Sequence, residues 1–134
     1  MIHYYALGGG LGHLTRGRRV LEALGLEATF LTASAYASDP RVTGGFPVIQ
    51  VPPDLSSEWL RSIVRERLIV DTFPCGIQGE LAGLDVPMDL VARRLRWDEY
   101  RRAVPHPVPR FDRVWLMEDL EPAHEAALWS AAKA

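Results

Sequence analysis

The feature that most constrains this chain is a glycine-rich loop near its start, which reads Gly8-Gly9-Gly10-Leu11-Gly12-His13. The loop follows an apolar run that begins at Ile2, and a helical pattern of apolar residues begins at Leu14. Glycines let the backbone approach a ligand closely, and the amino end of a helix presents free N–H groups to an anion. A strand, a glycine loop and a helix in this order predict a site for an anionic, phosphate-bearing group.

The spacing of this loop differs from that of the common nucleotide-binding motifs. In the dinucleotide fingerprint counted from Gly8, His13 replaces the third glycine, and no acid ends the next predicted strand. A Walker A loop has lysine after its last glycine, whereas Arg18 follows Gly17 here. Cys75 has no arginine six residues later, which excludes the usual cysteine-phosphatase loop. We therefore expect no NAD site and no bound cofactor.

Length and composition predict a single domain that spans residues 1–134, of which 48% are apolar. The net charge of −2 predicts no broad attraction to nucleic acid or to a membrane surface. A single cysteine excludes an internal disulfide and fits a reducing compartment. The sequence contains no apolar run of membrane-spanning length and no basic region typical of a signal peptide, so we expect a cytoplasmic location.

Apolar periodicity predicts alternating strands and helices along the chain. The predicted strands span residues 2–7, 28–32, 46–51, 68–70, 88–95 and 114–117, and the predicted helices span 14–24, 56–67, 97–104 and 121–132. This alternation predicts an α/β, Rossmann-like doubly wound fold with a mostly parallel sheet and helices on both faces. Ligands of such sheets bind outside the C-terminal ends of the strands, where the glycine loop and the loop after residue 70 would meet.

His13 and Arg16 are the candidate functional side chains of the first loop and helix. The positive end of a helix disfavours imidazolium, so His13 is suited to act as a general base on a hydroxyl group, or it merely bonds the loop. A cation near a helix N-terminus opposes the helix dipole, by roughly 0.3–1 kcal/mol at an exposed position. Arg16 therefore pairs with a bound anion, or points outward with Arg18 and Arg19 toward carboxylates such as Glu22.

A second candidate segment follows the predicted strand at 68–70. Asp71 at its end either orients a substrate hydroxyl or, as we favour, caps a turn through bonds to the next backbone N–H groups. Gly76 either lets the backbone approach a ligand or completes a turn. Glu80 is expected near the start of a short helix, where an acid is favourable without any function.

The remaining polar and aromatic residues carry no strong functional signal. An acidic cluster near the end of the chain lacks a histidine or a second acid at ligand spacing, so we expect no metal site; its members are Asp112, Glu118, Asp119 and Glu121. Core packing is expected for the four tryptophans, which are Trp59, Trp97, Trp115 and Trp129.

Three segments resemble the N-terminal, acceptor-side half of GT-B glycosyltransferases, in particular the group related to the enzyme that adds N-acetylglucosamine to a lipid-linked muramyl peptide. The first is the loop Gly8–Arg16, which is similar to a Gly-x-Gly-His-x-x-Arg motif of that group. The second is Asp71-Thr72-Phe73-Pro74-Cys75-Gly76, followed by Glu80-Leu81. The third is 111–119, which resembles the strand that ends this half. Ile77-Gln78 depart from the more basic residues common after the second motif.

The resemblance implies that this domain binds the acceptor of a sugar-transfer reaction, such as an anionic or lipid-linked sugar. It implies that His13 is the catalytic base, and that the substrate-binding residues are Gly9, Gly10, Gly12, Arg16, Asp71 and Gly76. The sequence holds no second glycine-rich loop and none of the acids that hold the donor ribose in that family.

The resemblance therefore predicts an acceptor-binding half that needs a separate donor-binding chain. Two alternatives stay open at this point. One is a non-enzymatic module that binds a phosphorylated or glycosylated small molecule or another protein. The other is a truncated remnant that covers its exposed rim by self-dimerisation. The sequence identifies neither the acceptor nor the donor.

Overall fold

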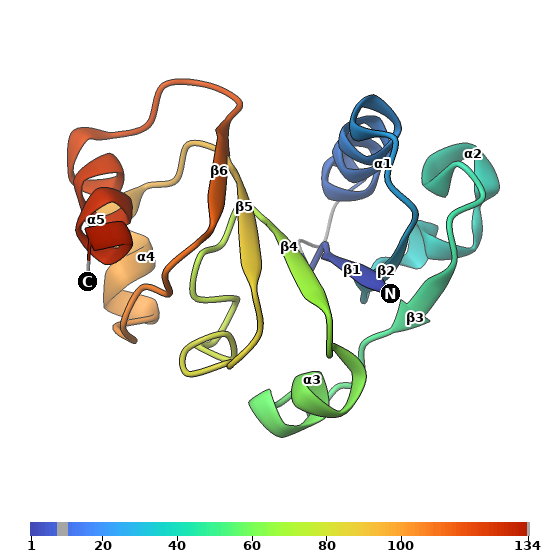
Figure 1. Cartoon of the computed structure of the whole chain (residues 1–134), viewed down its shortest axis with the longest axis horizontal. Coiled ribbons are helices and arrows are strands. Elements are labelled where there is room, and N and C mark those ends of the chain that lie inside the picture. Colours follow the sequence, from blue (N-terminus) through green and yellow to red (C-terminus); the bar gives the residue numbers. More distant parts are fainter. Residues whose placement is uncertain (8–10, 134) are drawn as a thin grey trace.

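A computed structural model of the chain describes residues 1–7 and 11–133, along which strands and helices alternate (Figure 1). The strands are β1 (Ile2–Tyr5), β2 (Ala28–Thr32), β3 (Val48–Gln50), β4 (Arg67–Asp71), β5 (Met88–Ala92) and β6 (Arg113–Leu116). The α-helices are α1 (Gly12–Leu24), α2 (Pro40–Thr43), α3 (Ser57–Ile63), α4 (Trp97–Ala103) and α5 (Pro122–Lys133), and η1 (Ala35–Ser38) is a 3-10 helix.

The six strands form one sheet in the order β3-β2-β1-β4-β5-β6. Every neighbouring pair is parallel, which confirms the predicted α/β, Rossmann-like class. The strand order is that of the Rossmann fold, and its direction reverses between β1 and β4. The C-terminal ends of these two strands are therefore the place where such a sheet leaves a crevice for a ligand.

Helices cover both faces of this sheet (Figure 1). Tyr4 and Phe30 belong to the core beneath α1 and α2, whereas Tyr5 and Leu31 belong to the core beneath α3 and α5. Successive side chains of a strand point to opposite faces, so neighbouring residues of β1 and β2 pack alternately into the two cores. Helices α4 and α5 contact each other through Trp97 and His124, whose rings are stacked at 4.4 Å.

Helix α1 packs closely on the sheet at Gly17. A Cβ at this position would lie 2.7 Å from a ring carbon of Tyr4 and 2.7 Å from a ring carbon of Phe30. The helix ends at Gly25, whose left-handed conformation (φ 65°) lets its N–H bond the last turn. The absence of a side chain at Gly17 is therefore what lets the helix lie this close to the sheet.

Several element boundaries differ from the sequence prediction. The strand expected at 88–95 ends at Ala92, because Arg93 and the backbone N–H of Arg94 turn to bind Glu118. The helix expected at 56–67 ends at Ile63, and β4 begins at Arg67. Among the described residues, no helix has the length and apolar character needed to cross a membrane.

Candidate functional site

The candidate site lies where β1 and β4 end. Asp71 is the last residue of β4, and His13 and Arg16 lie in the first turns of α1, which follows β1. Alternation along β4 places Ile69 and Asp71 on the face that α1 covers. The reversal of strand order therefore brings two segments together that lie 55 or more residues apart in the chain.

The Asp71 carboxylate accepts hydrogen bonds from the side chains of Tyr4 (2.7 Å), His13 (3.0 Å), Arg16 (2.8 Å) and Thr72 (2.6 Å). These four donors and Asp71 are called the Asp71 cluster below. The Asp71 side chain is completely buried. The favoured prediction, a carboxylate that caps a turn through backbone N–H groups, is wrong: the bonds that the structure describes to this carboxylate come from side chains. The alternation of β4 explains this, because it turns the carboxylate toward α1.

The environment of Asp71 stabilises its charged form. Burial by itself would raise the pKa of this carboxyl group, but hydrogen bonds from His13, Arg16, Thr72 and Tyr4 outweigh it and lower the pKa below its usual value. Burial and the neighbouring Asp71 charge raise the pKa of Tyr4 well above its usual value, so its hydroxyl remains a donor. Asp71 is therefore a carboxylate at neutral pH.

His13 contacts Asp71 through one ring nitrogen only. Its Nδ1 atom lies 3.0 Å from Oδ1 of Asp71. A carboxylate can only accept, so we assign the proton of neutral His13 to Nδ1 and the lone pair to Nε2. Phe73 stacks on the imidazole ring, with the ring centroids 5.8 Å apart and the planes at 29°. The His13 side chain is 17% exposed, so solvent or a substrate reaches it.

Arg16 lies against Asp71 and leaves little of its charge for a ligand. Its Nε atom lies 3.3 and 3.2 Å from the two carboxylate oxygens, and one Nη atom lies 2.8 Å from Oδ1. The same Nη lies 3.3 Å from Nδ1 of His13 and 3.4 Å from the hydroxyl of Thr72. The alternative of an outward-pointing arginine paired with a surface acid holds for Arg18, which pairs with Glu22, but not for Arg16.

Thr72 has a strained backbone beside the site. Its φ of 70° is the only positive value at a non-glycine residue of the described chain. Such a conformation is unusual for a β-branched residue and costs about 1–3 kcal/mol. In this conformation the Thr72 hydroxyl donates to Asp71, and the next residue, Phe73, stacks on His13.

Glu80 forms a second buried cluster, which holds the loop 73–80. Its carboxylate accepts from the hydroxyl of Tyr5 (2.5 Å) and from the backbone N–H groups of Ile77 (3.1 Å) and Gln78 (2.9 Å). A Cβ at Gly76 would lie 2.3 Å from this carboxylate, and the φ of Gly76 is +83°. The short helix expected at Glu80 is absent from the described residues. Of the two roles predicted for Gly76, the structure shows the one in a turn, because the Glu80 carboxylate fills the space beside its Cα.

The glycine loop is described in part. Gly9 and Gly10, predicted to bind substrate, lie outside the described residues together with Gly8. Gly12 is exposed and begins α1, where a Cβ would meet only Nη1 of Arg16 at 4.0 Å. In the described part of the chain, no group of three histidine, cysteine or acidic side chains lies close enough to hold a metal ion. Three members of the predicted acidic cluster have separate partners: Asp112 pairs with Arg67, Glu118 with Arg93, and Glu121 with the N–H of Trp97.

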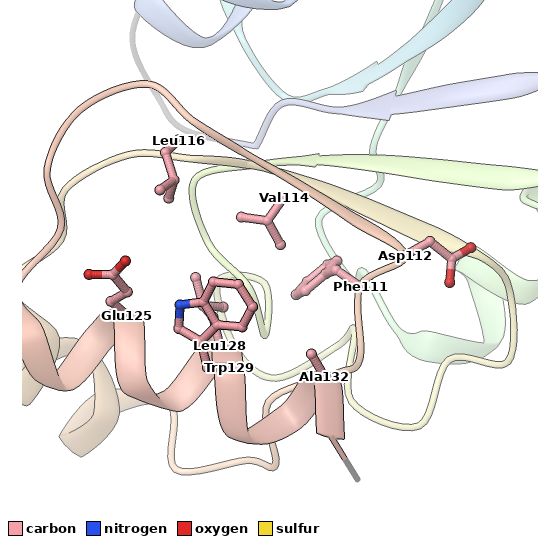
Figure 2. Close-up of a pocket in the computed structure, with 8 residues that line it drawn as sticks. All are labelled: Phe111, Asp112, Val114, Leu116, Glu125, Leu128, Trp129 and Ala132. Carbon is pink, nitrogen blue, oxygen red and sulfur yellow. The ribbon is translucent and has the colours of Figure 1, made fainter.

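An apolar groove lies elsewhere on the molecule, between β6 and α5 (Figure 2). It has a volume of about 260 Å³, and Val114 and Leu116 of β6 point toward Trp129 of α5 across it. Trp129 is 62% exposed, so the expectation of core packing is wrong for this tryptophan, whereas Trp97 is buried. The groove shares no residue with the Asp71 cluster, and its polar lining consists of the carboxylates Asp112 and Glu125.

Sequence analysis did not identify Tyr4, Thr72 or Phe73 as parts of the site. A signal exists for Tyr4, since a buried tyrosine hydroxyl needs a polar partner and Tyr4 lies in an otherwise apolar strand. Comparison of the chain with family models, with curated proteins and with solved structures finds no match. Among residues 1–7 and 11–133, Nε2 of His13 has no hydrogen-bond partner, while Nδ1 contacts a buried carboxylate. A histidine oriented in this way can remove a proton from a hydroxyl group.

Proposed function

We propose that this chain is the acceptor-binding part of a glycosyltransferase and that His13 is its general base. The observation that carries the proposal is the 3.0 Å contact between Nδ1 of His13 and the buried Asp71 carboxylate. This contact orients the ring and keeps the proton of the neutral imidazole on Nδ1, so that the lone pair of Nε2 can accept a proton. Three further features support the proposal: the location at the reversal of strand order, the glycine-rich sequence that precedes α1, and the resemblance of three segments to GT-B enzymes.

The proposed reaction has a simple proton and electron balance. Nε2 of His13 removes the proton of an acceptor hydroxyl as its oxygen attacks the anomeric carbon of a nucleoside diphosphate sugar. The bond from that carbon to the phosphate oxygen breaks, and the nucleoside diphosphate leaves with the electron pair. The donor sugar is bound by a separate chain in this proposal.

The experiment is an activity assay on the tagged chain isolated from its native cell extract with its associated proteins. The preparation is incubated with nucleoside diphosphate sugars labelled in the sugar, and transfer of label to extract lipids and small hydroxyl compounds is measured. We expect His13→Ala to lower the transfer rate by about 10²–10⁴-fold, since that is the usual contribution of a positioned base. His106→Ala is the matched control, because His106 is an exposed histidine outside the Asp71 cluster.

The assay separates the proposal from its alternatives. Full transfer activity in His13→Ala would rule out His13 as the base. A preparation that contains no second protein and transfers no sugar would favour the non-enzymatic binding module. Isothermal titration with sugar phosphates and nucleotides then tests the module, and an absence of heat would count against small-molecule binding.

A further inference from the structure

The charges around His13 show a pattern that a simple histidine–carboxylate pair does not need. A buried carboxylate beside a histidine stabilises the imidazolium and so favours protonation before any substrate binds. A base that is already protonated cannot accept a proton from a hydroxyl. A cation that pairs with the carboxylate leaves it in place to orient the ring but reduces its attraction for a proton on the ring.

Arg16 has the geometry of such a device. Its guanidinium contacts both oxygens of Asp71, at 3.2 and 2.8 Å, in the two-pronged arrangement that arginine makes with carboxylates. The side chains of Arg16 and Asp71 are 13% and 0% exposed, so water screens the pair little. The Nη atom that binds Oδ1 also lies 3.3 Å from Nδ1 of His13, close enough to oppose a positive charge on the ring.

We propose that Arg16 is a positioning residue that neutralises Asp71, so that His13 stays a neutral imidazole with its proton on Nδ1 and its lone pair on Nε2. Asp71 then orients the ring, and Arg16 cancels the charge that would otherwise protonate it. In the described part of the chain, the charged groups in contact with His13 are Asp71 from β4 and Arg16 from its own helix, and Phe73 adds an uncharged ring. The catalytic meaning of this role rests on the proposed function, but the charge pattern does not.

The test is a titration of the histidine rings by NMR, using the full chain with labelled histidine and no substrate. The four histidines are assigned with single substitutions, and exposed His106 serves as the internal reference. In Arg16→Gln the Asp71 charge is uncompensated, so we expect the His13 titration midpoint to move to higher pH by about one unit or more. Arg16→Lys retains the positive charge and should keep the midpoint close to that of the wild type.

Asp71→Asn should move the His13 titration midpoint in the opposite direction. It leaves the Arg16 cation beside His13 without a carboxylate, so the His13 midpoint should move to lower pH. A loss of structure would instead bring both variants to the same value, because both rings would then meet solvent. Opposite movements in Arg16→Gln and Asp71→Asn are therefore a signature that a purely structural role of Arg16 does not produce.

The wild-type chain provides a measurement that depends on no variant. Long-range nitrogen–proton correlations identify which ring nitrogen carries the proton, and we expect neutral His13 to carry it on Nδ1. A proton on Nε2, or a midpoint in Arg16→Gln that is unchanged or lower, would overturn the proposal. If the titrations behave as expected and no sugar transfer is found, the proposed function fails while the role of Arg16 stands.

Discussion

Asp71 and Glu80 are buried carboxylates that accept hydrogen bonds from two successive tyrosines of β1, yet their surroundings differ. Tyr4 donates to Asp71 and Tyr5 donates to Glu80, on opposite faces of the sheet. The other partners of Asp71 are side chains, two of which are a histidine and an arginine. The other partners of Glu80 are backbone N–H groups of its own loop.

This difference separates a site for chemistry from a support for a loop. Asp71 is linked to a partly exposed imidazole, which can change its protonation when a substrate arrives. Glu80 is linked to the turn that contains Gly76, and Tyr100 holds the same turn by accepting from the N–H of Cys75 and donating to the carbonyl of Gly76. Burial and a tyrosine partner are therefore not sufficient to recognise a functional carboxylate; its remaining partners decide.

The largest expected effect comes from removing Asp71. Asp71→Ala leaves the buried Arg16 cation without its carboxylate, and we expect the free energy of unfolding to fall by about 3 kcal/mol. Chemical denaturation measures this loss. Glu22→Ala is the matched control, because Glu22 pairs with exposed Arg18 on the same helix and should cost at most about 0.5 kcal/mol. Equal losses in the two variants would contradict a buried ion pair.

The stability difference between wild type and Asp71→Ala should depend on pH. The pKa of Asp71 is lower in the folded chain than its unfolded value of about 3.9. The stability that Asp71 contributes is therefore fully present above the unfolded pKa and is lost as the pH falls through the folded pKa. The gap in unfolding free energy between wild type and Asp71→Ala should narrow as the pH is lowered from about 5 toward 2. A gap that stays constant over this range would contradict the charged state of Asp71.

A smaller effect is expected at the second carboxylate. Glu80→Ala removes the acceptor of the Tyr5 hydroxyl and of two backbone N–H groups, so we expect a loss of about 2 kcal/mol in unfolding free energy and faster proteolysis within residues 73–80. Glu80→Gln keeps one acceptor oxygen and should lose less. The NMR signals of the His13 ring should be unchanged in both variants. A change in the His13 titration would mean that the two clusters are coupled.

The smallest expected effect on stability comes from removing the hydroxyl of Tyr4 or Tyr5. Tyr4→Phe and Tyr5→Phe each remove one buried hydrogen bond, for about 1 kcal/mol of unfolding free energy in each case. Only Tyr4→Phe removes a donor from Asp71, so only this variant should change the His13 titration. Denaturation and histidine NMR on the pair measure both quantities. An identical His13 response in the two variants would show that Tyr4 does not act through Asp71.

The architecture was predictable because local pattern and fold agree. The short apolar runs of the sequence form the parallel strands, and the strand at 28–32 has the predicted bounds. The helix after the glycine loop and the close approach at Gly17 were also predictable, since apolar spacing and the absence of a side chain act locally. The boundaries that moved, such as the end of β5 at Ala92, depend on contacts with Glu118, which is distant in the sequence.

The candidate site was predictable only in its parts. The sequence by itself placed His13, Arg16 and Asp71 at the C-terminal edge of an α/β sheet, because glycine spacing and strand ends are local features. Only the tertiary structure decided that these three side chains contact one another, that Tyr4 joins them, and that Glu80 belongs to a separate cluster. The physical reason is that strand order and the face of each strand set the partners of a buried charge, and both follow from the packing of the whole sheet.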